Sequence, residues 1–345
     1  GLEVSTQYGV TDRDDGVNTS ISIAAGGAFD EGRGKASMML SYDNREAIYN
    51  ASRPASSISR ASAASPLGNT IFDTNNLPTP AAVAAAVPGS VPGDTFGFNN
   101  NNTLFTYVNK RDFVSPGGIT YDGFGQPGPF FSPNFQFNTG ALNLLTLPQT
   151  RYNAFGSVEY EINANFEAYA DFLFTQYDSK SELAASPSAG AATGTRVPVS
   201  NPFMPTELQA VLASRAGNPL GSFLLDKRFV ALGARVSQEI YDTYQMTTGL
   251  RGELGLLDWT YDLSGSYGRV DRTSIQTGNV SRSAVQQLLN ATDGGASLCA
   301  GGFDWYGETT LSDACKTFIG KTAKNLVIVD QRNVNFTVQG GLFEL

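Results

Sequence analysis

The sequence predicts an all-β chain that folds as an antiparallel transmembrane β-barrel with long, partly helical loops on one side. Apolar and polar residues alternate in segments of about 9 to 11 residues, the length of a tilted membrane-spanning strand. The connections between these segments alternate between short turns and very long stretches. Charged residues make up only 16% of the 345 residues, and apolar content, at 41%, is not raised to compensate. An average soluble domain has about 25% charged residues.

Eight segments carry the alternation and are predicted as strands. In the first, Leu2, Val4 and Tyr8 face one way and Glu3 faces the other. Because successive side chains of a strand point to opposite faces, each segment has one apolar and one polar face. We predict a single antiparallel meander with the apolar face toward lipid and the polar face toward a lumen. The strands lie near residues 2–10, 17–25, 35–44, 151–160, 166–177, 236–254, 259–270 and 326–345.

The connections predict which side of the membrane each strand end occupies. Turns of a few residues follow the second, fourth and sixth strands, whereas residues 45–150, 178–235 and 271–325 form long connections. Outer-membrane barrels have short periplasmic turns and longer exterior loops. Helical pieces are predicted near 205–214 and 281–290 within these loops, and the first loop, rich in Ala, Pro, Asn and Gly, is expected to be poorly ordered alone. Aromatic residues at strand ends predict interfacial girdles at Tyr42, Tyr152, Tyr160, Tyr177, Tyr244, Trp259 and Tyr267.

Composition excludes several classes of function. No apolar run approaches the roughly 18 to 20 residues of a membrane-spanning helix. A net charge of −9 without a basic cluster argues against a nucleic-acid partner. The chain has no His and only two Cys, so it lacks the residues of Ser-His, Cys-His and His-metal catalysis. We therefore expect no enzyme, no cofactor and no metal site.

Six stretches of the sequence carry a family resemblance, and none of them is a catalytic motif. They are Lys227–Val230, Tyr241–Gly252, Ser266–Gly268, Gly278–Ser283, Gly294–Gly302 and Val338–Leu345. They resemble TonB-dependent receptors of the outer membrane, closely over about the last third of the chain and by pattern elsewhere.

The resemblance implies a fold and a function. That family has a plug domain, preceded by a segment that engages TonB, inside a barrel of about 22 strands. Only early barrel strands are matched, and plug, TonB segment and most later strands are lacking, so we expect a fragment that forms an arc of the larger barrel. The implied function is active uptake of a scarce nutrient, such as a ferric siderophore, cobalamin or an oligosaccharide. The implied partners are outer-membrane lipid, the nutrient, and the TonB system acting through the plug, in a Gram-negative bacterium.

Two groups of residues are candidates in the last long loop. Cys299 and Cys315 are expected to form a disulfide in an oxidising compartment, with free thiols as the alternative. Phe303, Trp305 and Tyr306 beside them form either an exterior platform for a ligand ring or a small structural core for the loop.

Charged residues supply the remaining candidates. Lumen-facing charges are expected to contact a plug or line a substrate path, with ordinary lumen hydration as the alternative. Asp12, Asp14 and Asp15 around Arg13 suit either a calcium ion or, more simply, a solvated hairpin tip. The lumen-facing candidates are Glu159, Glu167, Asp171, Arg251 and Asp262.

Two other functional classes remain open from the sequence. The first is a non-transporting barrel, an adhesin or surface anchor, in which eight strands close by themselves. The second is a soluble or secreted β-rich protein whose strands bury their apolar faces in a sandwich. A plug encoded upstream, a small closed barrel, or solubility without detergent would distinguish the three.

Overall fold

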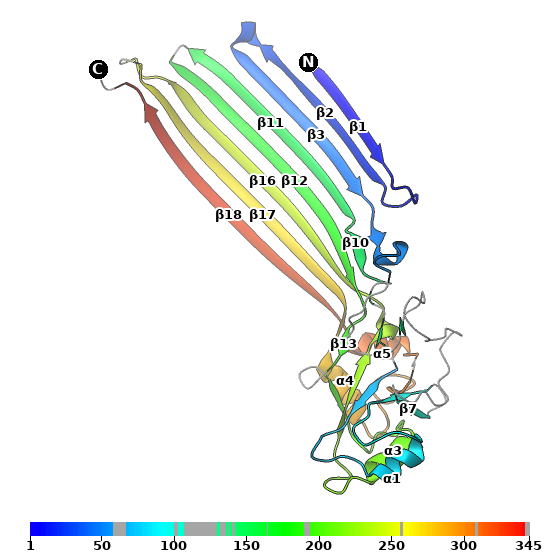
Figure 1. Ribbon diagram of the computed structural model, residues 1–345. Coiled ribbons are helices and arrows are strands. Elements are labelled where there is room, and N and C mark those ends of the chain that lie inside the picture. The colour runs from blue at the N-terminus through cyan, green and yellow to red at the C-terminus, as the bar shows by residue number, and fades with distance from the viewer. Residues whose placement is uncertain are drawn as a thin grey trace.

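The computed structural model describes residues 1–57, 67–99, 103–106, 130–131, 136–137, 139, 142–163, 165–189, 194–255, 258–307 and 310–341. The chain forms two parts (Figure 1). One is a long, curved eight-stranded sheet, and the other is a compact unit of short strands and helices beyond one end of that sheet. We call the compact part the head unit. Both ends of the chain lie at the far end of the sheet, away from the head unit (Figure 1).

The eight-stranded sheet is an antiparallel meander, as predicted. Its order, β1-β2-β3-β11-β12-β16-β17-β18, follows the chain. The outer strands β1 and β18 are edges, so this sheet is open, and none of the sheets in the described part of the chain is closed. The strands are β1 (Leu2–Gly9), β2 (Asn18–Phe29), β3 (Gly34–Arg45), β11 (Gln149–Asn163), β12 (Phe166–Leu183), β16 (Arg235–Glu253), β17 (Thr260–Val280) and β18 (Gly320–Gln339).

Several strands are longer than predicted. β12 and β17 run to Leu183 and Val280, so the predicted loops 178–235 and 271–325 begin inside strands. The extensions lack an apolar face, and polar pairs join them instead: Gln238 donates to Asp178 at 2.8 Å, and Arg272 pairs with Glu239 at 2.9 Å. β18 starts earlier than predicted and ends at Gln339, and residues 342–345 lie outside the described residues.

The register places the predicted apolar residues of neighbouring strands on one face. Directly opposed residues of antiparallel strands point to the same side of the sheet. Phe174 lies opposite both Ala154 and Tyr244. In the other strand pairings, too, residues of the apolar face lie opposite residues of the apolar face. At the tight turn between β2 and β3, the Phe29 ring lies over Gly34 and occupies the space that a Cβ would need. This glycine therefore allows an aromatic ring to close the end of the sheet.

The head unit is built from all three long connections. Its six strands are β5 (Asn69–Ile71), β6 (Phe96–Phe98), β7 (Leu104–Thr106), β13 (Pro187–Ser188), β14 (Thr195–Val197) and β15 (Phe223–Arg228). Its helices are α1 (Pro80–Ala86), α3 (Thr206–Ala213), α4 (Arg282–Asn290) and α5 (Asp313–Ile319). Shorter elements are β4 (Ile48–Tyr49), β8 (Phe130–Phe131), β9 (Gln136–Phe137), β10 (Leu144–Thr146), η1 (Asp30–Gly32), η2 (Asn50–Ser52) and η5 (Val230–Leu232).

In the described ranges, the long connections form short strands and helices. The two predicted helical pieces correspond to α3 and α4, and Ser281 begins α4 by accepting a hydrogen bond from the backbone of Ala284. The first connection, expected to be poorly ordered alone, contributes α1 and pairs β5 with β15 of the second. Its described segments thus contact a distant part of the chain.

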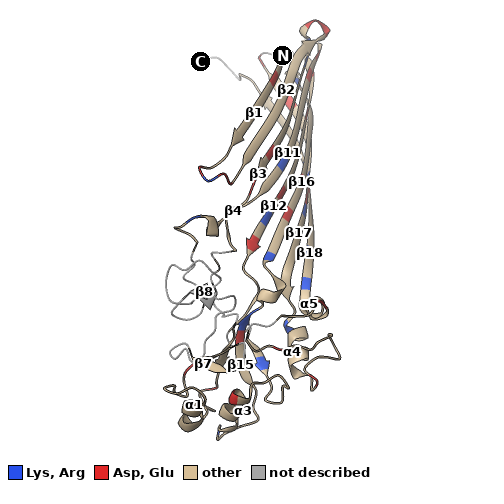
Figure 2. Cartoon of the chain, turned by 90° about the vertical axis from the view of Figure 1, so that its right-hand side faces the viewer, with Lys and Arg blue, Asp and Glu red and all other residues tan. Residues whose placement is uncertain are grey.

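Among the described residues, the hydrophobic core lies in the head unit, and Val280 at the end of β17 packs against it. Its largest fully buried side chains include Phe96, Phe98, Phe303 and Trp305, and no residue of the eight-stranded sheet belongs to the core. Seen from the side, the sheet is a single layer with the head unit beyond its end (Figure 2). The dry core between two packed sheets that a sandwich requires is not formed by the described eight strands. None of the helices described is long and apolar enough to cross a bilayer.

Candidate functional site

The candidate site comprises the two faces of the eight-stranded sheet. On one, which we call the apolar face, large hydrophobic side chains are exposed along every strand. Monomeric soluble proteins rarely expose a continuous apolar surface of this extent. The exposed residues include Leu2, Val4, Ile21, Ile23, Met38, Leu40, Val158, Phe172, Met246, Leu250, Leu263, Val334 and Phe336.

An aromatic line bounds the apolar face on the side of the head unit. Tyr42 contacts Tyr152, and Phe174 contacts Tyr244, each with ring centroids 5.1 Å apart. We call this line the upper boundary; it faces the head unit, which Figure 1 draws at the bottom. It contains Tyr8, Tyr42, Tyr152, Phe174, Tyr244 and Tyr267.

The upper boundary runs obliquely across the register. Tyr8 shares its register row with Thr273 of β17, whereas the boundary residue of β17 is Tyr267, six residues further from the head unit. The line therefore drops by about one residue per strand. With a rise of about 3.3 Å per residue and a strand spacing of about 4.8 Å, that slope corresponds to a strand tilt of about 35°. Strands of membrane barrels tilt by about 35–45°.

A second aromatic line, the lower boundary, crosses the far end of the apolar face. Phe29 stacks on Tyr160 with centroids 6.0 Å apart, and Phe166 meets Tyr261 at 6.2 Å. The segments Tyr152–Tyr160 and Phe166–Phe174 each run from one boundary to the other in nine residues, and on the β17 side Trp259, two residues beyond Tyr261, begins a nine-residue segment that ends at Tyr267. None of their side chains on the apolar face is charged. Nine residues correspond to a minimal membrane-spanning strand.

The opposite face, the polar face, brings four of the five predicted lumen charges together. Arg251 bridges Glu159, at 2.6 Å, and Glu167, whose Oε1 accepts from Nε at 2.7 Å. The Arg251 guanidinium lies 5.3 Å from the centre of the Tyr169 ring, and the Tyr169 hydroxyl donates to Asp262 at 2.9 Å. Asp171 lies four residues further along β12 than Glu167, opposite Ser157 and Thr247 and outside this network.

Two members of this network were not among the predicted residues. Lys35 reaches Glu159 at 3.5 Å, and Tyr169 links Arg251 to Asp262. In the alternating pattern of their strands, both side chains fall on the polar face. Only the strand register reveals that they lie next to the predicted charges. Beside it lies a cavity of about 460 Å³ lined by Glu161, Glu167, Glu253, Asp262 and Arg251 among others. This end of the polar face is therefore acidic.

One girdle prediction is wrong. Tyr177 lies opposite Arg151 and Tyr241, which places it on the polar face, whereas the other six predicted girdle residues lie on or next to the apolar face. β12 continues beyond the upper boundary, so a tyrosine near its predicted end is not at an interface of the apolar face. An aromatic residue at a strand end therefore marks the edge of the apolar face only in strands that end at that edge.

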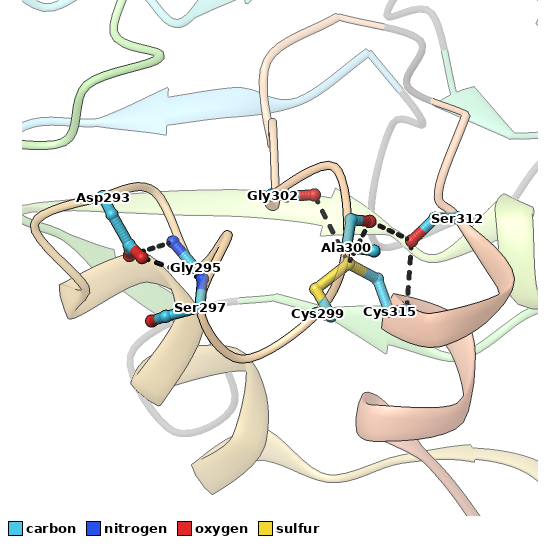
Figure 3. The surroundings of a disulfide bond; sticks show 8 residues. All are labelled: Asp293, Gly295, Ser297, Cys299, Ala300, Gly302, Ser312 and Cys315. Carbon is cyan, nitrogen blue, oxygen red and sulfur yellow. Dashed lines mark hydrogen bonds between the residues drawn. A yellow bond between two sulfur atoms is a disulfide. The ribbon is translucent and has the colours of Figure 1, made fainter.

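The two cysteines form a disulfide in the head unit, with Cα atoms 4.9 Å apart (Figure 3). Ser312 begins α5 by accepting from the backbone of Cys315 at 3.2 Å, and its hydroxyl donates to the carbonyl of Ala300 at 2.6 Å. In the preceding loop, the Asp293 carboxylate accepts from the backbone of Gly295 and Ser297 (Figure 3). The bonds from Ser297 and Gly295 hold the pKa of Asp293 below its usual value.

The aromatic trio Phe303, Trp305 and Tyr306 lies in the core of the head unit and not on an exposed platform. Trp305 packs between Phe303, at 5.0 Å, and Phe229, at 4.4 Å between ring centroids. All three rings are buried. Burial raises the pKa of Tyr306 and of the adjacent carboxyl of Asp304.

At the tip between β1 and β2, Asp15 is engaged by protein groups. Arg53 pairs with it at 2.7 Å, and Thr11 donates to the same carboxylate. The Arg53 guanidinium holds the pKa of the Asp15 carboxyl well below its usual range. Asp12 and Asp14, the other two candidates for a calcium ion, do not form a metal-ligating cluster with Asp15. In the described residues, no group of three or more metal-ligating side chains occurs.

Neither the protein-family models nor the curated proteins compared with this chain gave a match.

Proposed function

We propose that the eight-stranded sheet is an arc of an outer-membrane β-barrel and that the chain is part of a TonB-dependent transporter that takes up a scarce nutrient. The observation that carries the membrane assignment is the uncharged, nine-residue band between two aromatic boundaries. Its oblique course across the register supports tilted strands in a wall perpendicular to a bilayer. The edges β1 and β18 cannot remain unpaired in lipid, so further strands complete the barrel.

The connections orient the arc. The three short turns lie at the lower boundary and the head unit lies beyond the upper boundary, which supports an exterior head unit and a periplasmic lower boundary. The Cys299–Cys315 disulfide agrees with an exported location. The polar face would then line the lumen.

The transport assignment is supported by the sequence resemblance and by the acidic end of the polar face. Arg251 is shared between Glu159 and Glu167, while Glu161, Glu253 and Asp262 add further negative charge. A plug with basic side chains would be complementary to this surface. An eight-stranded adhesin that closes on itself is less well supported, because β1 and β18 are separate edges.

Energised uptake tests the proposal. The full-length protein is produced in cells with and without a functional TonB system, and accumulation of a labelled ferric siderophore, cyanocobalamin and an oligosaccharide is followed. We expect accumulation of one class only when the TonB system is present. Arg251→Gln should reduce the uptake rate, whereas Arg269→Gln, which changes a charge on the opposite face, should not. Equal accumulation of every solute with and without TonB would contradict transport.

A further inference from the structure

Four residues form a continuous row across the polar face on the head-unit side of the sheet. Arg151 of β11, Tyr177 of β12, Tyr241 of β16 and Arg272 of β17 lie directly opposite one another in consecutive strand pairings. At about 4.8 Å per strand, the two arginines flank the two tyrosines over about 14 Å. We call this the Arg-Tyr-Tyr-Arg row.

The side chains of the row contact each other while staying accessible. The Tyr177 and Tyr241 rings meet edge to face at 5.9 Å, and the Arg272 guanidinium lies 5.6 Å from the centre of the Tyr241 ring. Arg151 pairs with Asp43 at 3.3 Å and Arg272 with Glu239 at 2.9 Å. The arginine side chains remain 44% and 40% exposed, so both can accept a further partner.

Charge on the polar face changes sign between its two ends. On the head-unit side, strands β3 to β17 carry Arg45, Arg151, Arg235 and Arg272 but only the carboxylates Asp43 and Glu239. At the opposite end, Lys35 and Arg251 face five carboxylates, those of Glu159, Glu161, Glu167, Glu253 and Asp262. In a chain of net charge −9, the positive charge of this face is concentrated at the head-unit end.

We propose that the Arg-Tyr-Tyr-Arg row binds an anionic solute built of rings that carry carboxylate or similar oxyanion groups. All the basic residues at this end are arginines, whose planar forks bind oxyanions in a bidentate manner. The two tyrosines between them offer ring surface and hydroxyls to the body of the solute. The inference rests on the proposed function, because it takes the polar face as the lumen and the head-unit end as the entrance.

Two sources share this chemistry, acidic oligosaccharides and ferric catecholates, and titration calorimetry on the full-length protein in detergent distinguishes them. The probes are tetragalacturonate, the neutral maltotetraose of equal length, and a ferric tricatecholate. The variants are Arg151→Gln, Arg272→Gln and Arg272→Lys, which keeps the charge but removes the fork. The control is Arg269→Gln, since Arg269 lies on the same strand as Arg272 but on the apolar face. Heat-modifiable migration checks that each variant folds.

We expect one of the two anionic probes to bind and maltotetraose not to bind. Arg151→Gln and Arg272→Gln should each weaken binding about tenfold or more, Arg272→Lys should weaken it as well, and Arg269→Gln should stay within about twofold. Binding should also weaken as salt is raised. The binding probe identifies the source of the solute.

Three results would overturn the inference: equal binding of maltotetraose, row variants with wild-type affinity, or no binding of either anionic probe. Different outcomes test the proposed function and the binding site. Row-dependent binding without TonB-dependent uptake would refute transport and leave this binding site standing. Energised uptake that is unaffected by the row variants would refute the binding site alone.

Discussion

Asp304 is a half-buried carboxyl whose charge costs the head unit stability. Burial raises its pKa, although the backbone of Tyr306 donates to it and Lys227 lies nearby. The folded state therefore binds a proton more readily than the unfolded chain. Between the unfolded pKa of about 3.9 and the raised folded pKa, stability must fall as pH rises.

Replacing Asp304 with Asn should remove this penalty. We expect Asp304→Asn to stabilise the head unit at neutral pH and to abolish its gain in stability on mild acidification, as followed by hydrogen exchange of the core amides of α4. Asp293→Asn is the matched comparison, because hydrogen bonds lower the pKa of Asp293 and its contribution disappears as pH falls through that lowered value. Identical pH profiles for the wild type and Asp304→Asn would refute the role assigned to burial.

The Cys299–Cys315 disulfide should stabilise the head unit locally. Closing a loop of this length contributes about 3 kcal/mol in the chain-entropy estimate. Reduction should therefore accelerate proteolysis between α4 and α5, while the eight-stranded sheet keeps its heat-resistant migration. Two thiols that alkylate freely in the untreated, exported protein would contradict the bond.

At the scale of the strand, two neighbouring residues of β12 are predicted to differ in how well they tolerate substitution. Phe172 lies on the apolar face within the uncharged band, two residues from Phe174 of the upper boundary, and Asp171 lies on the polar face. If the apolar face contacts lipid as proposed, Phe172→Arg should reduce the stability of the assembled protein, by an amount that approaches about 2 to 4 kcal/mol for a charge near mid-bilayer. Asp171→Asn should have little effect. Folded yield in the outer membrane and urea titration in vesicles compare the two, and equal tolerance would mean that the faces are wrongly assigned.

The strands could be predicted from sequence because each carries its own signal. Alternation over nine or more residues needs no knowledge of distant partners, whereas the register between neighbouring strands came only from the structure. Where that signal stops, the prediction stopped too. The upper parts of β12 and β17 alternate between two polar faces and were assigned to loops. The same extension of β12 explains why the sequence predicts a girdle residue at Tyr177, where the structure has a polar-face residue.

The head unit could not be predicted because its strands and helices pack against segments that are far away in the sequence. Its strands are two to six residues long, and β5 pairs with β15 across more than 150 residues of chain. Such short segments carry no periodicity of their own. The aromatic trio was singled out by composition, but whether it was exposed or buried depended on Phe98, Phe229 and Lys227, which come from other connections. Likewise, the lumen charges were predicted singly, and the register supplied their network.

At the scale of the whole molecule, the two parts are stabilised by different means. The head unit has a dry core and a disulfide, whereas the sheet relies on backbone pairing and exposes its apolar face. A sheet of this kind needs a second apolar phase against that face. In the proposed function, that phase is lipid in contact with the band between the two aromatic boundaries.

A spin-label scan along β12 tests this claim most directly. Single cysteines are introduced from position 166 to 180 of the full-length protein, which is labelled and reconstituted in lipid vesicles; the native cysteines are paired and do not compete. We predict that labels at positions 168, 170, 172 and 174 are accessible to oxygen and protected from a water-soluble nickel complex. Odd-numbered labels should show the reverse, and the alternation should end beyond Phe174. Equal exposure of both faces to the nickel complex throughout β12 would contradict a membrane-spanning sheet.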